Sequence, residues 1–138
     1  MSAMQEDFFA DTALVGIATA LPAYRFCWLL NKQFNIDFIR EPELDVCLQI
    51  VPEKSTYFPI YQYALPLSGN KYLLYKLKND KESLLPEAKQ LDYLWLLQSN
   101  APETDAQEIV QHLRNVPEIQ LAQLLVPEKL KSLNHLLV

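Results

Sequence analysis

The spacing of hydrophobic and polar residues predicts more strands than helices in this chain. Strict alternation over 44–50 is typical of a half-buried strand. Two alternating stretches around a turn signal at 68–70 predict a β-hairpin over 56–78, in which Pro59 indicates an edge strand or a bulge. Apolar runs predict further strands at 12–19, 36–39, 91–98 and 119–126. A short buried helix is the alternative at 91–98, because periodicity does not separate the two in a continuous apolar run.

Two segments show apolar residues at helical spacing. The first is 20–34, where Thr19 stands in position to cap the helix. The second is 104–115, where Thr104 and Gln107 match a capping box. The predicted order of elements is therefore β-α-β-β-β-β-β-α-β.

This order predicts one α+β domain over residues 1–138, with 1–11 as a flexible N-terminus. Each helix must cover a face of the sheet, and right-handed crossovers bring both helices to the same or neighbouring faces. We therefore expect a two-layer sandwich, in which two main helices pack on a mostly antiparallel mixed sheet. Such an architecture resembles a variant of the ferredoxin-like fold.

Charge and composition narrow the classes of function. The net charge is −5, and the Lys and Arg residues form no dense cluster. Nucleic-acid binding is not expected, because it normally begins with a basic patch. A membrane partner is not expected either, because anionic lipid repels a chain of this charge and no long apolar segment occurs.

The glycines and cysteines add two further expectations. Only Gly16 and Gly69 occur, so the glycine-rich loops that cradle phosphate cannot be written, and no cofactor is predicted. Cys27 and Cys47 lie in apolar surroundings without a CxxC motif, which indicates reduced thiols in the cytoplasm. A disulfide between them is the less favoured alternative. The segment 1–10 lacks the features of a signal peptide, so export is not expected.

Two segments resemble a known family. The stretch 85–93, LPEAKQLDY, is similar to the motif that names the IPExxxVDY family of small bacterial proteins, with leucine in place of the motif's isoleucine and valine. Its strict matches are Pro86, Glu87, Asp92 and Tyr93. The stretch 24–31, YRFCWLLN, is similar to that family's helix. The resemblance covers nearly the whole chain and implies a single-domain cytoplasmic protein, but that family's function is unknown and it supplies no activity, ligand or catalytic residue.

The motif and the nearby helix suggest one candidate binding site. Arg25 could clamp an anionic ligand, while Glu87 and Asp92 could act as acid and base beside Tyr93. The alternative interpretation is structural. In it, Glu87 satisfies backbone N–H groups at a turn, Asp92 pairs with a cation, and Arg25 pairs with one of the two carboxylates. We favour the structural alternative, since structural ion pairs also perturb carboxylates.

Tyrosines on the predicted hairpin form a candidate interface. On a solvent-facing sheet they would make an aromatic patch suited to a protein partner, and on an inner face they would belong to the core. These residues are Tyr57, Tyr61, Tyr63 and Tyr75. His112 and His135 have no second ligand at metal-binding spacing, so we expect surface histidines and no metal site.

Two functional hypotheses are compatible with these sequence features. The favoured one is a non-enzymatic interaction module that forms a homodimer or binds a protein partner through an edge strand or the aromatic face of the hairpin. Its support is the lack of a catalytic constellation together with the tyrosine-rich hairpin. The alternative is a small-molecule-binding protein or an enzyme that uses Arg25, Glu87 and Asp92, and it requires these side chains to converge on a pocket.

Overall fold

The computed structural model describes residues 10–65, 67–79 and 81–136, which form two α-helices, ten strands and short 3-10 helices. The helices are α2 (Ala23–Phe34) and α3 (Pro102–Arg114). The strands are β1 (Thr12–Thr19), β2 (Ile39–Arg40), β3 (Val46–Val51), β4 (Lys54–Phe58), β5 (Ile60–Ala64), β6 (Lys71–Lys76), β7 (Lys78–Asn79), β8 (Glu82–Ser83), β9 (Tyr93–Gln98) and β10 (Ile119–Leu125). The 3-10 helices are Pro42–Leu44, Pro86–Ala88, Pro127–Lys129 and Leu133–Leu136.

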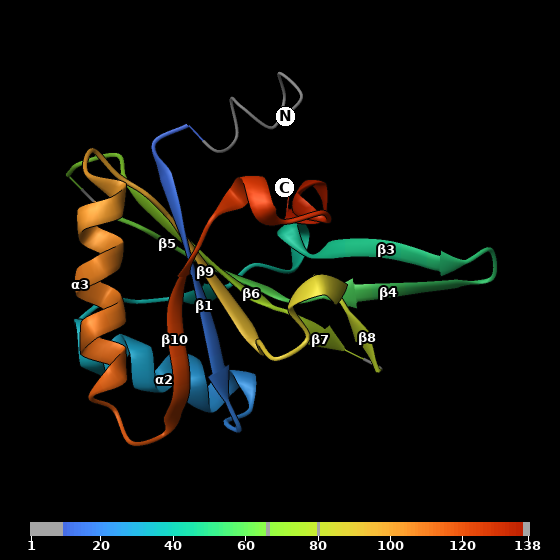
Figure 1. The fold of residues 1–138 in the computed structure, drawn as a ribbon, viewed down its shortest axis with the longest axis horizontal. Helices are drawn as coiled ribbons and strands as arrows, with labels where there is room; N and C mark the ends of the chain where they lie inside the picture. Colours follow the sequence, from blue (N-terminus) through green and yellow to red (C-terminus); the bar gives the residue numbers. More distant parts are fainter. Residues whose placement is uncertain (1–9, 66, 80, 137–138) are drawn as a thin grey trace.

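A six-stranded sheet in the order β10-β1-β9-β6-β5-β2 forms the centre of the fold (Figure 1). All of its described pairings are antiparallel, whereas the sequence predicted a partly mixed sheet. The central strands β1 and β9 are buried along almost their whole length, which explains their continuous apolar sequences. The prediction of a strand rather than a helix at 91–98 is confirmed.

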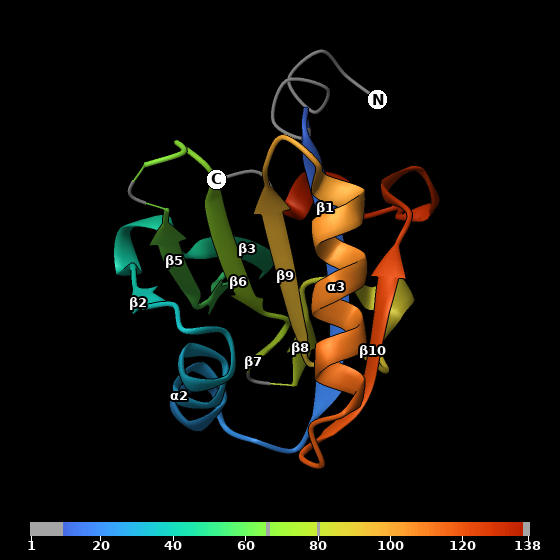
Figure 2. The same cartoon turned by 90° about the vertical axis from the view of Figure 1, so that its left-hand side faces the viewer.

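Both helices pack on one side of this sheet, which we call the helix face (Figure 2). α3 buries residues spaced three and four apart, namely Ala106, Ile109, Val110 and Leu113. α2 contributes Phe26, Cys27, Leu29 and Leu30 to the same core. Val15 and Trp95 meet these helices from the sheet and are fully buried. Of the two expected placements, on the same face or on neighbouring faces, the structure shows the first.

The opposite side, which we call the hairpin face, is also covered. Sheet residues such as Leu73 and Leu94 are buried there beneath the base of β3 and β4, the connection 84–91 and Leu136. The prediction of only two layers is therefore too simple, because loops and hairpins form a cover of their own. This second core explains why the connection between β8 and β9 contains several buried leucines and an alanine, namely Leu84, Leu85, Ala88 and Leu91.

Strands β3 and β4 form a two-stranded arm that projects from the body (Figure 1). Val46 and Phe58 lie opposite each other and are buried at its base, while Cys47 and Tyr57 face outward. The sequence predicted one strand across 56–65, and this is wrong. Pro59 divides that stretch into β4, which belongs to the arm, and β5, which belongs to the main sheet.

The predicted helix caps are also wrong. The N-cap positions are Pro22 in α2 and Ala101 in α3, and neither makes a side-chain capping hydrogen bond. Thr19 Oγ1 instead donates to the Glu118 carbonyl at 2.7 Å, which links β1 to the start of β10. The capping box at 104–107 does not form, because α3 begins two residues before Thr104.

Most of the segment predicted to be a flexible N-terminus, residues 1–11, lies outside the described residues. At its end, Asp11 has a positive φ of 55°, and its carbonyl accepts the backbone N–H of Ser99 at 3.0 Å. The chain is therefore tied to the end of β9 from Asp11 onward.

Candidate functional site

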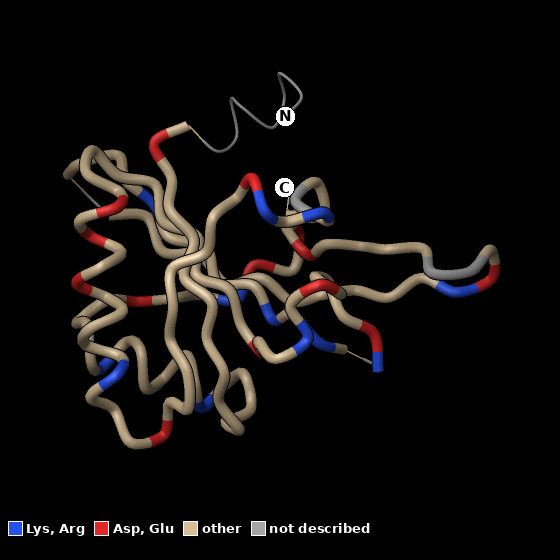
Figure 3. Tube along the Cα trace, in the orientation of Figure 1, with Lys and Arg blue, Asp and Glu red and all other residues tan. Residues whose placement is uncertain are grey.

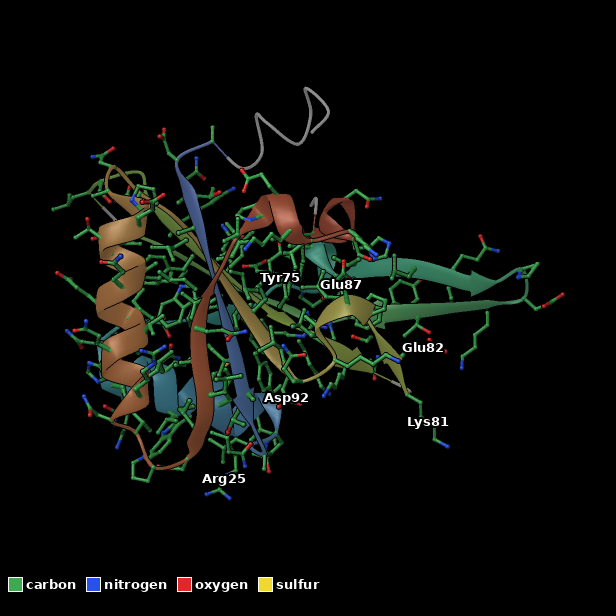
Figure 4. All side chains as sticks on the ribbon, viewed as in Figure 1. Arg25, Tyr75, Lys81, Glu82, Glu87 and Asp92 are labelled. Atoms are coloured by element: carbon green, nitrogen blue, oxygen red, sulfur yellow. The ribbon has the colours of Figure 1, made fainter. Side chains whose placement is uncertain are left out.

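The predicted ligand clamp, Arg25, lies apart from both motif carboxylates. It lies in the first turn of α2 with an exposed side chain, and Figure 4 shows it at the lower margin of the molecule. Within the described residues Arg25 has no ion pair. The predicted pairing of Arg25 with Glu87 or Asp92 is therefore wrong.

Asp92 links β1, β7 and β9. Its Oδ2 accepts the backbone N–H of Thr19 at 3.0 Å, and its Oδ1 lies 3.2 Å from Lys78 Nζ. The residue stands just before β9, so it fastens the end of β1 and the start of β7 to that strand. This arrangement matches the structural interpretation, in which Asp92 pairs with a cation.

Glu87 fastens the C-terminal segment. Its Oε2 accepts the backbone N–H of Ser132 at 2.6 Å. Partial burial raises the pKa of Glu87, but hydrogen bonds from its own backbone N–H and those of Ser132 and Lys131 outweigh burial and lower the pKa below its usual value. Glu87 thus satisfies backbone N–H groups, as the structural interpretation expected.

Tyr93 orders the connection between β1 and α2. Its hydroxyl donates to the Leu21 carbonyl at 2.8 Å, and its ring centroid lies 4.4 Å from the ring centroid of Phe26. Burial raises the pKa of the hydroxyl. Asp92 and Tyr93 both line a hollow of about 250 Å³ beside this connection, but Arg25 and Glu87 do not. The four predicted binding residues therefore do not converge on one pocket.

The four predicted interface tyrosines are also separated. Tyr57 lies on the arm and is 57% exposed, whereas Tyr75 on β6 is fully buried on the hairpin face. Tyr61 and Tyr63 on β5 are half-buried on the helix face. The ring centroid of Tyr63 lies 6.1 Å from that of Tyr72. The predicted single aromatic patch is not formed, because the break at Pro59 and the alternation of strand faces distribute its members over three places.

The two histidines make hydrogen bonds rather than a metal site. His112 Nε2 lies 2.9 Å from Gln33 Oε1, which links α3 to α2. His135 Nδ1 lies 2.9 Å from the Leu84 carbonyl, so this nitrogen carries the proton. Among the described residues, no group of three or more His, Cys, Asp and Glu side chains could hold a metal ion.

Sequence reasoning missed that β10 is an open edge of the sheet. It predicted the strand but not its place, and its outer side has no strand beside it in the described chain. Its sequence, IQLAQLL, carries no charge, and Figure 3 shows the whole strand uncoloured by charge. Leu124 is 41% exposed and Val126, just past the strand, is 48% exposed. Long uncharged edge strands readily pair with another strand.

Two shallow hollows lie between this edge and α3. Their volumes are about 320 and 300 Å³, and both are lined by Gln107 and Leu124. Arg114 lines the second hollow, and its Nε donates to the Ala122 carbonyl at 3.1 Å. Arg114 thus occupies one backbone acceptor in the middle of β10. The signal in the sequence was the lack of charge over 119–126, a feature that soluble edge strands usually avoid.

Comparison with known proteins adds no relative. No protein-family model and no curated protein matches the chain. Neither α-helix in the described ranges has the length and apolarity that crossing a membrane requires.

Proposed function

We propose that the protein is a small non-enzymatic cytoplasmic interaction module that forms a homodimer through β10. The observation that carries this proposal is the outer edge of β10, beside which no strand lies among the described residues, and which is uncharged and presents an exposed Leu124. Backbone N–H and C=O groups on such an edge can add a strand from another chain, and the side chains along it supply apolar contact.

A second copy of the same chain suits this edge. Two antiparallel β10 strands can pair about a two-fold axis at Ala122, which sets Gln120 of one copy opposite Leu124 of the other. The small Ala122 then lies at the axis, where the two strands need least bulk. The same operation places the two α3 helices side by side, so that Gln107 and Gln111 meet across the seam. The strand itself has no charged side chain that could pair with a charged peptide.

Arg114 limits the strength of this association. Its side chain must leave the Ala122 carbonyl before a partner N–H can use that acceptor, and two Arg114 side chains approach each other near the axis. We therefore expect a weak, reversible dimer rather than a permanent one.

Light scattering over a concentration series tests the proposal. The mass should rise from 16.0 kDa toward twice that value as concentration increases. Leu124→Lys should keep the protein monomeric, since a lysine on an edge strand blocks strand addition. Leu67→Lys is the matched control, because Leu67 is fully exposed on the turn between β5 and β6 and should leave the dimer intact. A monomer at all concentrations, or equal effects of the two variants, would overturn the proposal.

Two more detailed proposals, one on the family and one on the fold, accompany this function. Membership of the IPExxxVDY family rests on the strict matches at Pro86, Glu87, Asp92 and Tyr93. A ferredoxin-like core is supported by the order β10-β1-β9-β6 and by both helices lying on one face. In this assignment β2 to β5, including the arm, are an insertion between the first helix and the second core strand.

A further inference from the structure

A separate cleft of about 520 Å³ opens on the hairpin face, away from the β10 edge. Its walls come from four parts of the chain: the arm, the β7–β8 hairpin, the connection that follows it, and the last 3-10 helix. The lining residues are Leu48, Lys78, Lys81, Glu82, Ser83, Pro86, Lys89 and His135. Its volume lies in the range of sites for small organic ligands.

The cleft is basic although the chain is acidic. Three lysines and one glutamate line it, whereas the whole chain carries a net charge of −5. Lys78 is paired with Asp92, but Lys81 and Lys89 have no ion-pair partner among the described residues. Figure 4 shows Lys81 projecting from the tip of the β7–β8 hairpin, where its flexible stem can turn toward a ligand. The concave surface therefore holds unneutralised positive charge.

One polar group in the wall has no hydrogen-bond partner among the described residues. The Ser83 hydroxyl is buried without a hydrogen-bond partner in the described chain, and an unpaired buried hydroxyl is costly. His135 also lines the cleft, but its Nδ1 donates to the Leu84 carbonyl, and in that tautomer of a neutral imidazole Nε2 is an acceptor rather than a donor to an anion. The groups of the wall that can recognise oxygen anions are therefore the hydroxyl and the lysines.

The apolar part of the wall indicates what the anion is attached to. Leu48 of the arm and Pro86 line the same space as the lysines. A free inorganic ion would leave this apolar surface in water, whereas an organic group would cover it. Leu48 lies on the inner side of the arm, opposite Thr56, so the position of the arm sets the width of the cleft.

We propose that this cleft binds a small organic phosphate, with Lys81, Lys89 and Ser83 contacting the phosphoryl oxygens and Leu48 and Pro86 contacting the organic group. The dianionic phosphate suits two unpaired ammonium groups. The Ser83 hydroxyl, which is buried in the wall, turns about its Cα–Cβ bond to reach the phosphate and so gains an acceptor that the described residues do not provide. The site shares no residue with the β10 edge, so the proposal of phosphate binding is independent of the proposal of a dimer.

Titration of the full chain with phenyl phosphate, followed by amide NMR, tests this site. We expect saturable shifts confined to Leu48 and its neighbours on the arm, to residues 78–89 and to residues 132–136, with inorganic phosphate binding at least tenfold more weakly. The double variant Lys81→Met, Lys89→Met should weaken binding at least tenfold. Lys32→Met is the control, because Lys32 lies on α2, on the helix face, and should leave the affinity unchanged.

Ser83→Ala separates a ligand role from a structural one. If Ser83 contacts phosphate, the variant should bind phenyl phosphate several-fold more weakly while its melting temperature stays equal or rises, because an unsatisfied hydroxyl has been removed. Shifts that do not saturate, or an affinity that none of these variants changes, would overturn the proposal.

Discussion

The hydroxyl of Tyr75 on β6 donates a 2.6 Å hydrogen bond to the carbonyl of Leu136, sixty-one residues further along the chain. Both residues are fully buried. Together with the bond from Ser132 N–H to Glu87, this contact holds the C-terminal segment on the hairpin face. The segment therefore belongs to the second core rather than to a loose tail.

Tyr75→Phe should lower the free energy of unfolding by about 1–3 kcal/mol, because it leaves the Leu136 carbonyl buried without a donor. Urea unfolding at pH 7 measures the change. Tyr63→Phe is the matched control on the neighbouring strand, since no hydrogen bond of its hydroxyl is found in the described structure. Equal stability of both variants and the parent would show that the Tyr75 bond contributes nothing.

Alkaline pH should destabilise the protein. Burial raises the pKa of the Cys27 thiol from 9.0 to about 12, and it also raises the pKa of Tyr75 and Tyr93. In each case the unfolded chain loses its proton first, so the stabilisation is complete below the unfolded pKa and is lost as pH rises above it. The free energy of unfolding should be flat near pH 7.5, fall above about pH 9 and fall more steeply above about pH 10.

Cys27→Ala isolates the thiol in this profile. It should be less stable than the parent at pH 7.5, because a buried group is removed, yet lose less stability between pH 8.5 and 10. Parallel profiles for the two proteins would contradict the assignment of the first decline to Cys27.

Glu87→Gln should reduce stability at neutral pH by less than about 1 kcal/mol, since solvent screens this partly exposed carboxylate. The pKa of Glu87 is lowered in the folded state, so its contribution is present above the unfolded pKa and disappears as pH falls through the folded value. The difference in thermal stability between Glu87→Gln and the parent should therefore be smaller at pH 3 than at pH 7. An equal difference at both pH values would indicate a role for Glu87 other than its charge.

Arg114→Ala should strengthen self-association. It frees the Ala122 carbonyl for a partner strand and removes the charge that two copies bring together. Sedimentation equilibrium should give a dimer dissociation constant several-fold below that of the parent. Arg25→Ala is the control, because Arg25 is equally charged and exposed but lies on α2. A weaker dimer in Arg114→Ala would mean that Arg114 holds the partner instead of excluding it.

Gly16→Ala should lower the free energy of unfolding by about 1–3 kcal/mol through overpacking. A Cβ at this position would lie 2.5 Å from Leu91 Cδ1 and 3.3 Å from Leu125 Cδ1, and Leu91 is fully buried. The double variant Gly16→Ala, Leu91→Ala should be less destabilised than the sum of its two single variants. Additive losses in urea unfolding would contradict direct contact between the two positions.

The local pattern was sufficient for the main strands and helices. β1 and β9 are covered on both faces, so their runs of apolar residues indicate buried strands without any knowledge of the partners. α3 has one apolar stripe facing the sheet, and its 3.6-residue period is readable directly. Pro59 indicated an irregularity in the predicted strand. That it divides the stretch between the arm and the main sheet could not be predicted, because local spacing does not show that β4 and β5 belong to different sheets.

The candidate site could not be predicted in the same way. Asp92 forms an ion pair with Lys78 because β7, which follows β6, starts beside the start of β9. Glu87 accepts a hydrogen bond from Ser132, which lies forty-five residues further along the chain. Both partnerships depend on how distant segments meet. Parity along the chain placed Tyr57 with Tyr61 and Tyr63, and that inference failed once Pro59 ended the strand. The cleft collects residues from four segments, and none of them forms a motif by itself.

The position of β1 between β9 and β10 has a consequence for synthesis of the protein. β1 is complete at residue 19, but its neighbours begin only at residues 93 and 119. A growing chain therefore carries an apolar strand whose two hydrogen-bonding partners have not yet been translated. Contacts between such distant segments close slowly, and an unpaired strand of this kind invites aggregation. The complete central sheet can therefore form only after β10, which ends at Leu125, has been translated.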